Sequence, residues 1–275
     1  QAVKSQNVLD QWILSLLNKL VKDVTSDLDT YDTIRPIEKI QNFVKDFSTW
    51  YIRRSRDRVG PSATDQRDKN AFYTSCYEVL VTLSKLLAPI TPFLAEEIYR
   101  NLTDEESVHL ADWPQAHESL ISLNTMFQME RIREIVEHIH ASRKEKEQRV
   151  RQPLKRLGIF GVPEKEKNAY GKFEKLLKEE LNIKNIAYLF YKDLPKGDYI
   201  VDGTITGPKS GKLREDRFFV DLEITPELKA EGEARDLVRK IQEERKKIGT
   251  KLNEKVDVVL EDWPKEHEDY IKRKA

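Results

Sequence analysis

Arginine and aromatic side chains are concentrated in one short segment, residues 50–58. Its members of these types are Trp50, Tyr51, Arg53, Arg54, Arg56 and Arg58. A guanidinium group can pair with two oxygens of one phosphate, and an aromatic ring can stack on an unpaired base for about 1–3 kcal/mol. The segment therefore predicts a contact with nucleic acid. The competing interpretation is that the rings belong to a hydrophobic core and the arginines form a solvated helix face.

Two further basic clusters follow along the chain. One surrounds Gln152-Pro153 and contains Arg143, Lys144, Lys146, Arg149, Arg151, Lys155 and Arg156. It is the clearer candidate for holding phosphates, with Arg149, Arg151 and Lys155 as the expected contacts. The other contains Arg235, Arg239, Lys240, Arg245, Lys246 and Lys247, interleaved with Glu231, Glu233, Glu243 and Glu244. Ion pairs between residues three or four apart on one helix explain that cluster better than a ligand does.

The sequence contains no arrangement of residues suited to catalysis or metal binding. The histidines show no metal-ligand spacing with Cys76, the single cysteine; they are His109, His117, His138, His140 and His267. A glycine-rich stretch ends in Lys212, but it has the wrong glycine spacing for a phosphate-binding loop, and Leu213 follows the lysine. A hairpin loop is the better interpretation of that stretch. No catalytic residue and no metal ligand is therefore predicted.

Charge and composition limit the classes of protein further. Lys plus Arg and Asp plus Glu each number 48 in 275 residues, so the net charge is zero and a uniformly basic protein is excluded. Any nucleic-acid site must be a local patch, and residues 96–118 are acidic where 50–58 and 143–156 are basic. A single cysteine excludes an internal disulfide and a four-cysteine zinc site. With no apolar stretch of about 18 residues and no signal-like start, we expect a cytoplasmic protein without a membrane partner.

Apolar spacing of three and four residues predicts helices over most of the first 115 residues. Pro36 and Pro92 suit the first turns of the second and fourth helices, and Asp65 and Thr91 suit the caps of the third and fourth. The apolar series of the four helices are Leu9, Ile13, Leu16, Leu17, Leu20 and Val24; Ile37, Ile40, Phe43, Val44, Phe47 and Tyr51; Phe72, Cys76, Val79, Leu80, Leu83, Leu86 and Leu87; and Phe93, Leu94, Ile98 and Leu102. Short breaks between amphipathic helices predict a bundle, closed by the acidic loop 103–114.

The spacing of the apolar residues changes in the second half of the chain. A helix over 123–149 is followed by strand-like runs at 157–162 and 183–191 with a helix over 165–181 between them. Residues 198–206 and 216–225 alternate as in a hairpin, residues 226–248 form a helix that Gly249 ends, and 256–260 form a last strand before a polar tail. We therefore predict a mainly α protein: a helical bundle over 1–115, a connecting helix over 116–149 and a small α/β domain over 150–275.

Four segments, taken together, resemble one family. Residues 46–58 and 86–99 resemble the anticodon-binding helical bundle of class I aminoacyl-tRNA synthetases. The element Ala88-Pro89-Ile90-Thr91-Pro92-Phe93 is shared with the valine, leucine and methionine relatives. Residues 50–56, 150–154 and 227–246 are closer to isoleucyl-tRNA synthetases. The segments occur in the family's order and cover nearly the whole chain.

The resemblance implies a tRNA-binding fragment that acts with tRNA(Ile). The family's His-Ile-Gly-His-like and Lys-Met-Ser-Lys-Ser-like catalytic segments are not in the sequence, so the chain corresponds to a C-terminal portion whose partners include the missing catalytic and editing domains. ATP and Mg are expected for the full enzyme and no cofactor for this fragment. Trp50, Arg53, Arg54 and Arg58 are expected at the anticodon stem-loop. Two alternatives are the same fragment of a valyl-tRNA synthetase and a helical protein-interaction scaffold.

Overall fold

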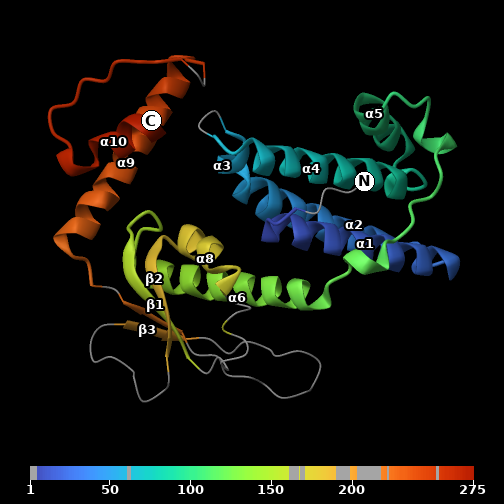
Figure 1. Cartoon of the computed structure of the whole chain (residues 1–275), viewed down its shortest axis with the longest axis horizontal. Helices are drawn as coiled ribbons and strands as arrows, with labels where there is room; N and C mark the ends of the chain where they lie inside the picture. The colour runs from blue at the N-terminus through green and yellow to red at the C-terminus, as the bar shows by residue number, and fades with distance from the viewer. Residues whose placement is uncertain are drawn as a thin grey trace. The chain divides into compact units, whose positions relative to one another are not determined.

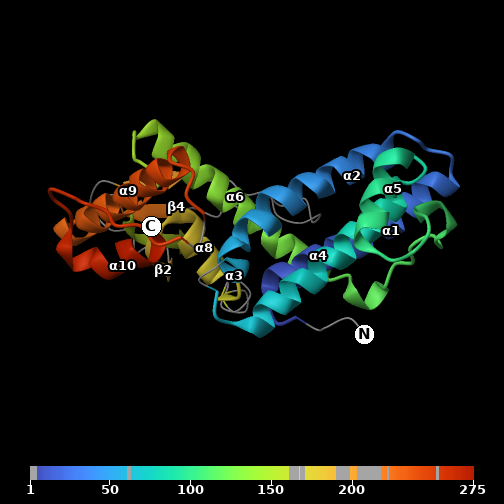
Figure 2. The ribbon, with the colours of Figure 1, turned by 90° about the horizontal axis from the view of Figure 1, so that it is seen from above.

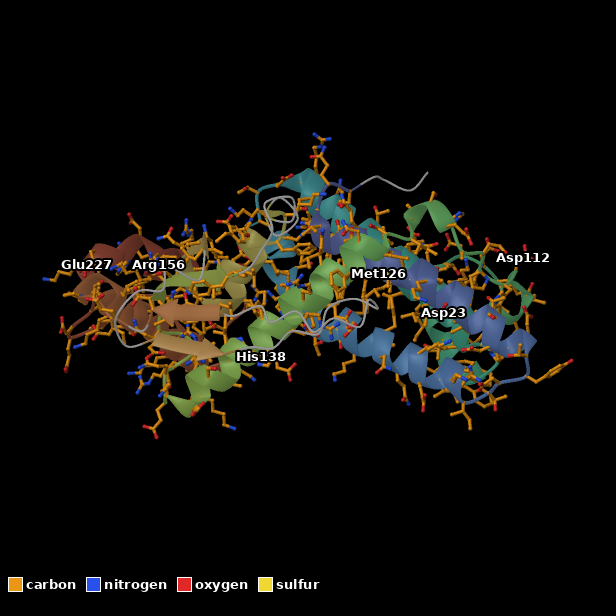
Figure 3. All side chains as sticks on the ribbon, turned by 90° about the horizontal axis from the view of Figure 1, so that it is seen from below. Asp23, Asp112, Met126, His138, Arg156 and Glu227 are labelled. Atoms are coloured by element: carbon orange, nitrogen blue, oxygen red, sulfur yellow. The ribbon has the colours of Figure 1, made fainter. Side chains whose placement is uncertain are left out.

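The computed structural model describes residues 5–60, 63–160, 167, 171–189, 199–202, 218–221, 223–251 and 254–275. The chain divides into two compact units, Gln1–Met126 and Phe127–Ala275. Met126 lies near the start of helix α6 (Leu123–Glu145), so most of that helix belongs to the second unit (Figure 3). The three-part division made from the sequence stays a prediction. Among the described residues, no helix is long and apolar enough to cross a membrane.

The first unit is a bundle of amphipathic helices (Figures 1 and 2). Its long helices are α1 (Val8–Asp29), α2 (Arg35–Asp46), α4 (Gln66–Leu87) and α5 (Pro92–Leu102). Helix α1 packs against α2 and α4, and α4 packs against α5. Asp65 caps α4 by accepting the N–H groups of Arg67 and Asp68, as predicted, whereas the Thr91 side chain makes no capping hydrogen bond. The predicted mainly α bundle is confirmed.

The apolar faces of two helices are narrower than the sequence spacing suggests. Ile37 and Val44 of α2 are exposed, and so are Phe93 and Leu94 of α5, which are 91% and 57% exposed. The prediction that these residues are buried is wrong. Helix α2 packs against α1 and α5 packs against α4, each at one side of the bundle, so only a thin stripe of each helix is covered.

Helix α2 continues into a π-helical turn, η1 (Phe47–Ile52), and then into the short helix α3 (Arg56–Val59). A stack of aromatic rings runs through this turn. The ring centroids of Phe43 and Phe47 are 6.3 Å apart, and those of Phe47 and Tyr51 are 5.7 Å apart. The ring of Tyr51 then stacks on Phe72 with a centroid distance of 5.4 Å. Offset stacking of this kind adds to the stabilisation from burial. This stack of rings fixes the position of the residues that follow it in the chain.

The loop after α5 returns along α1 and closes the bundle, as predicted. The Trp113 indole N–H donates to Thr25 Oγ1 at 2.8 Å, and the Ser122 N–H donates to Ser15 Oγ at 2.7 Å. Between these contacts, the His117 N–H donates to the buried side chain of Asn18. Polar side chains of α1 therefore anchor the loop, since each satisfies a backbone or indole donor that would otherwise need water.

The second unit contains α6, α8 (Glu174–Leu181) and a four-stranded sheet among its described residues. The strands are β1 (Leu154–Phe160), β2 (Ile183–Leu189), β3 (Tyr199–Asp202) and β4 (Phe218–Asp221), in the order β2-β1-β4-β3. Strands β1 and β2 are parallel and connected through α8, which packs against β2, and β4 is antiparallel to both β1 and β3. The β3–β4 pairing confirms the hairpin; its glycine-rich loop lies outside the described residues.

The chain ends in two helices, α9 (Pro226–Lys247) and α10 (Glu268–Lys274). Gly249 ends α9 with a φ of 76°, as predicted. Residues 256–260 have no regular secondary structure, and among the described residues no strand pairs with them, so the last predicted strand is wrong. The tail, predicted only to be polar, contains α10, and Ile271 of that helix packs against Val238 and Ile241 of α9.

Candidate nucleic-acid interface

The segment 50–58 is divided between the surface and the interior of the first unit. Arg53 and Arg56 are exposed, and Trp50 and Arg54 are half-buried. Arg53 lies against its own turn, with Nε donating to the Thr49 carbonyl at 2.9 Å. These four side chains remain candidates for a contact with nucleic acid, and two of them are exposed.

Tyr51 and Arg58 point inward and meet two carboxylates. The Tyr51 hydroxyl donates to Asp10 Oδ1 at 2.7 Å, and Arg58 donates through Nη1 and Nη2 to Oδ1 and Oδ2 of Asp10 at 2.7 and 2.8 Å. On its other side, Arg58 donates through Nε and Nη2 to the Asp68 carboxylate at 2.8 and 2.7 Å. Arg58 thereby joins α3 to both α1 and α4. Tyr51 and Asp10 are fully buried.

At neutral pH the Arg58 guanidinium is charged and the Tyr51 hydroxyl is protonated. Burial alone lowers the pKa of Arg58, but its hydrogen bonds to Asp10 and Asp68 outweigh burial and hold the pKa above its ordinary value. Burial, and then the Asp10 charge, raise the pKa of Tyr51. Both side chains are therefore structural. The prediction that Tyr51 contacts RNA is wrong because its ring has no exposed surface, and Arg58 supports the segment from inside.

The second basic cluster lies where α6 ends and β1 begins, in the second unit. Arg149, Arg151 and Lys155 are exposed. Arg149 Nη1 lies 3.2 Å from Asp236 Oδ2, and Arg151 Nη1 lies 3.5 Å from Asp236 Oδ1, so both arginines converge on one carboxylate of α9. Lys155 pairs with Glu223 at 3.8 Å. Exposed ion pairs contribute about 0–1 kcal/mol each, so a phosphate can replace these carboxylates at little cost.

Gln152 of the same cluster packs directly on α9. Its side-chain amide donates to the Leu228 carbonyl at 2.8 Å, and a Cβ placed on Gly232 would lie 2.5 Å from its Oε1. Glycine at position 232 is therefore what allows the close approach. Two of the segments that carry the family resemblance, 150–154 and 227–246, thus form one contact.

Three cations of the third cluster form ion pairs within α9, as predicted. Arg235 pairs with Glu231 at 2.9 Å, and Lys247 with Glu244 at 2.5 Å. Arg239 pairs with Glu243, which lies four residues later in the same helix. These three cations neutralise carboxylates of their own helix, so they are not candidates for a contact with nucleic acid.

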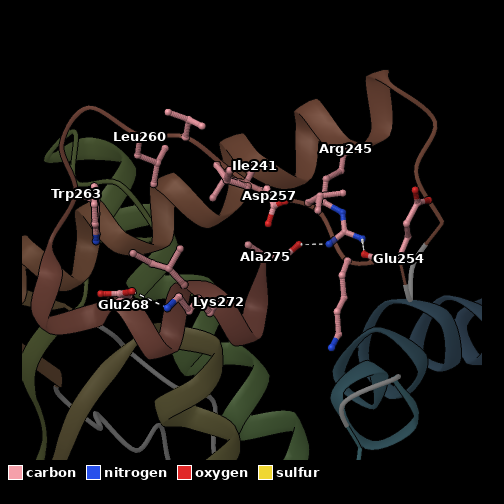
Figure 4. A pocket seen from close by; sticks show the side chains of 14 residues that line it. Ile241, Arg245, Glu254, Asp257, Leu260, Trp263, Glu268, Lys272 and Ala275 are labelled. Atoms are coloured by element: carbon pink, nitrogen blue, oxygen red, sulfur yellow. Dashed lines mark hydrogen bonds and ion pairs between the residues drawn. The ribbon is translucent and has the colours of Figure 1, made fainter.

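A groove of about 860 Å³ lies between α9, α10 and the segment 254–263 (Figure 4). Arg245 holds its rim by donating to the carbonyls of Ala275 and Glu254 at 2.8 and 2.7 Å. Lys272 on the other side pairs with Glu268. The side chains lining the groove include no Ser, Thr, Cys or His. Within the described part of the chain, no group of three His, Cys, Asp or Glu side chains could hold a metal ion.

Sequence reasoning missed Asp10 and Asp68 as partners of Arg58, and it missed the burial of Arg143. The signal for Asp10 was present, because it occupies the same helical face as Ile13 and Leu17, both fully covered in α1. Nothing in the local pattern distinguished Arg143 from the exposed basic residues around it.

Comparison with known proteins places these features in one family. The family model described as the anticodon-binding domain of tRNA ligase matches residues 10–157. The chain belongs to this family. The matched range holds the Asp10–Arg58–Asp68 network and every basic residue predicted to contact RNA, and it ends within β1.

Individual relatives extend the similarity beyond that range. An isoleucine--tRNA ligase of Dehalococcoides mccartyi (strain CBDB1) is 36% identical over 282 residues, which covers 97% of this chain and 27% of the relative. The isoleucine--tRNA ligase of Pyrococcus abyssi is 33% identical and covers 97% of this chain and 31% of the relative. That of Chlamydia trachomatis is 41% identical over 66% of this chain and 18% of the relative. The chain spans less than a third of the length of these relatives.

Proposed function

We propose that this chain binds tRNA(Ile) and recognises its anticodon as part of an isoleucine--tRNA ligase. The family membership over residues 10–157 supports a tRNA partner, and the isoleucine--tRNA ligases similar over nearly the whole chain support isoleucine over valine. Zero net charge does not oppose the proposal, because the cations are gathered in local patches.

The single observation that carries the proposal is that the buried Arg58 holds residues 50–56 in place on the bundle. Arg58 joins α3 to α1 and α4, while Arg53 and Arg56 are exposed and Trp50 is half-buried in the same segment. Bases of an anticodon loop are unstacked, so an exposed ring edge and guanidinium groups can bind their faces and edges. A rigid support lowers the entropic cost of that recognition.

The second unit contributes phosphate contacts in this proposal. Arg149 and Arg151 converge on a single carboxylate, and Lys155 lies on the adjoining strand β1. Such contacts supply affinity that depends on salt and does not discriminate between tRNAs. Isoleucine activation, with ATP and Mg, and editing would take place in the remainder of the longer protein, which acts on the same tRNA.

The experiment compares tRNA(Ile) binding by Arg53→Gln/Arg56→Gln with binding by the unmodified chain. We expect the affinity to fall about tenfold or more and the salt dependence to weaken by roughly one to two phosphate equivalents. Arg239→Gln is the matched control, because Arg239 is exposed and already paired within α9. If the double variant binds as tightly as the control, the surface of segment 50–58 is not the recognition site.

A further inference from the structure

Arg143 is the least expected member of the second basic cluster because it is completely buried. Its Nη1 donates to the carbonyl oxygens of Arg149 and Gln152 at 3.1 and 3.0 Å. Its Nη2 donates to the carbonyl of Leu181 at 2.7 Å, just before β2. One guanidinium therefore holds both ends of the turn 149–152 and joins them to the end of α8.

The charge of Arg143 is balanced by carbonyl dipoles. Among the described residues, none of its contacts is a carboxylate. Burial lowers its pKa to about 10, so the side chain still carries its proton at neutral pH. Replacing it would remove a donor from the carbonyl groups of Arg149, Gln152 and Leu181, and the loss is costly because the contact with Leu181 is fully buried. The contact thus fixes the backbone of the turn strongly.

Two other contacts hold the same turn. The Gln148 N–H donates to the Arg143 carbonyl at 2.8 Å and ends α6, with Glu147 in the left-handed conformation at a φ of 53°. From the side of β2, the Asn182 amide donates to the Arg151 carbonyl at 2.5 Å. The backbone at Arg149, Arg151 and Gln152 is therefore held from inside, while the side chains of both arginines extend outward.

The outward side chains meet at one point. Arg149 and Arg151 each place a guanidinium nitrogen on one oxygen of Asp236, at 3.2 and 3.5 Å. Two guanidinium groups that converge on the two oxygens of one anion have the arrangement that a backbone phosphate requires. Asp236 is 29% exposed at its side chain, so this anion site opens to solvent.

We propose that Arg143 is a positioning residue for a phosphate-binding turn: from inside the fold it sets Arg149 and Arg151 so that together they hold one phosphate of an RNA backbone, which displaces Asp236. This inference rests on the proposed function and deepens it. Arg143 itself touches no RNA. Its effect on binding passes through the two exposed arginines.

The test is a double-mutant cycle on binding of tRNA(Ile) over a range of salt concentrations. The variants are Arg143→Met, Arg149→Gln/Arg151→Gln and the combination of all three. We expect Arg143→Met to weaken binding about three- to tenfold and to lower the salt slope by roughly one phosphate, although Arg143 is buried. In the Arg149→Gln/Arg151→Gln background, Arg143→Met should have no further effect on either quantity.

Folding of each variant is followed by circular dichroism. If Arg143→Met does not fold, the cycle is repeated with Asn182→Gly, which keeps the left-handed conformation at position 182 and removes the contact with the Arg151 carbonyl. Arg143→Lys keeps the charge with fewer donors and should restore part of the affinity and slope.

The outcomes separate this inference from the proposed function. An unmodified chain that does not bind tRNA contradicts the proposed function and, with it, this inference. Normal binding that Arg149→Gln/Arg151→Gln weakens and the turn variants leave unchanged overturns only the role of Arg143. An equal loss from Arg143→Met with and without the two exposed arginines also overturns that role, because the effect would then be a general one on the fold.

Discussion

Arg58 and Asp10 form a doubly hydrogen-bonded ion pair inside the helical bundle, with Nη1–Oδ1 and Nη2–Oδ2 distances of 2.7 and 2.8 Å. Their side chains are 10% and 0% exposed. A buried pair of this kind is costly to break because the remaining charge stays in a poorly solvated place. The surface of segment 50–58 therefore depends on a contact that no RNA touches.

Removing the Arg58 charge should destabilise the first unit. We expect Arg58→Met to lower the free energy of unfolding by about 3 kcal/mol, since Asp10 would be left buried without its partner. Arg56→Gln, on the same short helix but exposed, should change it by less than about 0.5 kcal/mol. Urea denaturation of the two variants measures both. Equal effects would show that the network around Asp10 does not hold the bundle.

Cys76 should be a poorly reactive thiol. Burial, reinforced by the Asp10 charge, raises its pKa from 9.0 to about 12. At pH 8 the folded chain would hold about one thiolate in ten thousand, against about one in ten when unfolded. Because the folded pKa is the higher one, this group's contribution to stability is complete below pH 9 and is lost between about pH 9 and 12.

Alkylation with iodoacetamide measures the reactivity of the Cys76 thiol directly. The rate at pH 8 should rise by about two orders of magnitude or more when the chain is unfolded in urea. Since Cys76 is the only cysteine, the modification reports a single site. A native rate close to that of the unfolded chain would contradict the burial of this thiol.

The helices were the most predictable part of the fold, because apolar spacing is a local signal. Asp65 marked the start of α4, and Gly249 marked the end of α9. The depth of burial was less predictable. Phe93 and Leu94 fit a helical stripe, but whether a neighbouring helix covers them depends on the packing of α5 on α4 alone. The strand at 256–260 failed similarly, because a strand requires a partner that local sequence does not identify.

The candidate site was predictable in composition but not in orientation. Tyr51 and Trp50 are adjacent, yet one ring is buried in a stack and the other is partly exposed, because the π-helical turn η1 determines which side faces Phe72. Arg58 and Arg143 look like their exposed neighbours in the sequence. Their partners are Asp10, 48 positions earlier, and the carbonyl of Leu181, 38 positions later. Contacts between such distant positions have no local signature.

The effect of Gly232→Ala on the free energy of unfolding should depend on the residue at position 152. An added Cβ would displace the Gln152 amide from the Leu228 carbonyl, so we expect the free energy of unfolding to fall by about 1 kcal/mol. In a Gln152→Ala background, the same change should raise it by about 1 kcal/mol, because alanine is the better helix former. Thermal or urea unfolding of the four chains measures this cycle. The same sign in both backgrounds would contradict the close contact.

Two helix ends offer a matched pair of backbone tests. Glu147 after α6 and Gly249 after α9 both adopt positive φ values, 53° and 76°. Glu147→Gly should raise the free energy of unfolding by about 0.5–1 kcal/mol, and Gly249→Ala should lower it by about 1 kcal/mol. Urea unfolding curves check both variants, and a loss of stability from Glu147→Gly would show that its side chain has a role beyond the turn.

Anticodon recognition by this chain is tested most directly by changing only the anticodon of the RNA. The affinity of the 275-residue chain is measured for tRNA(Ile) and for the same tRNA carrying the valine anticodon, at low and at physiological salt. We predict at least about tenfold tighter binding to the intact tRNA(Ile), retained at the higher salt because base contacts do not depend on counterion release. Equal affinities at both salt concentrations would contradict anticodon recognition and leave only contacts with phosphates.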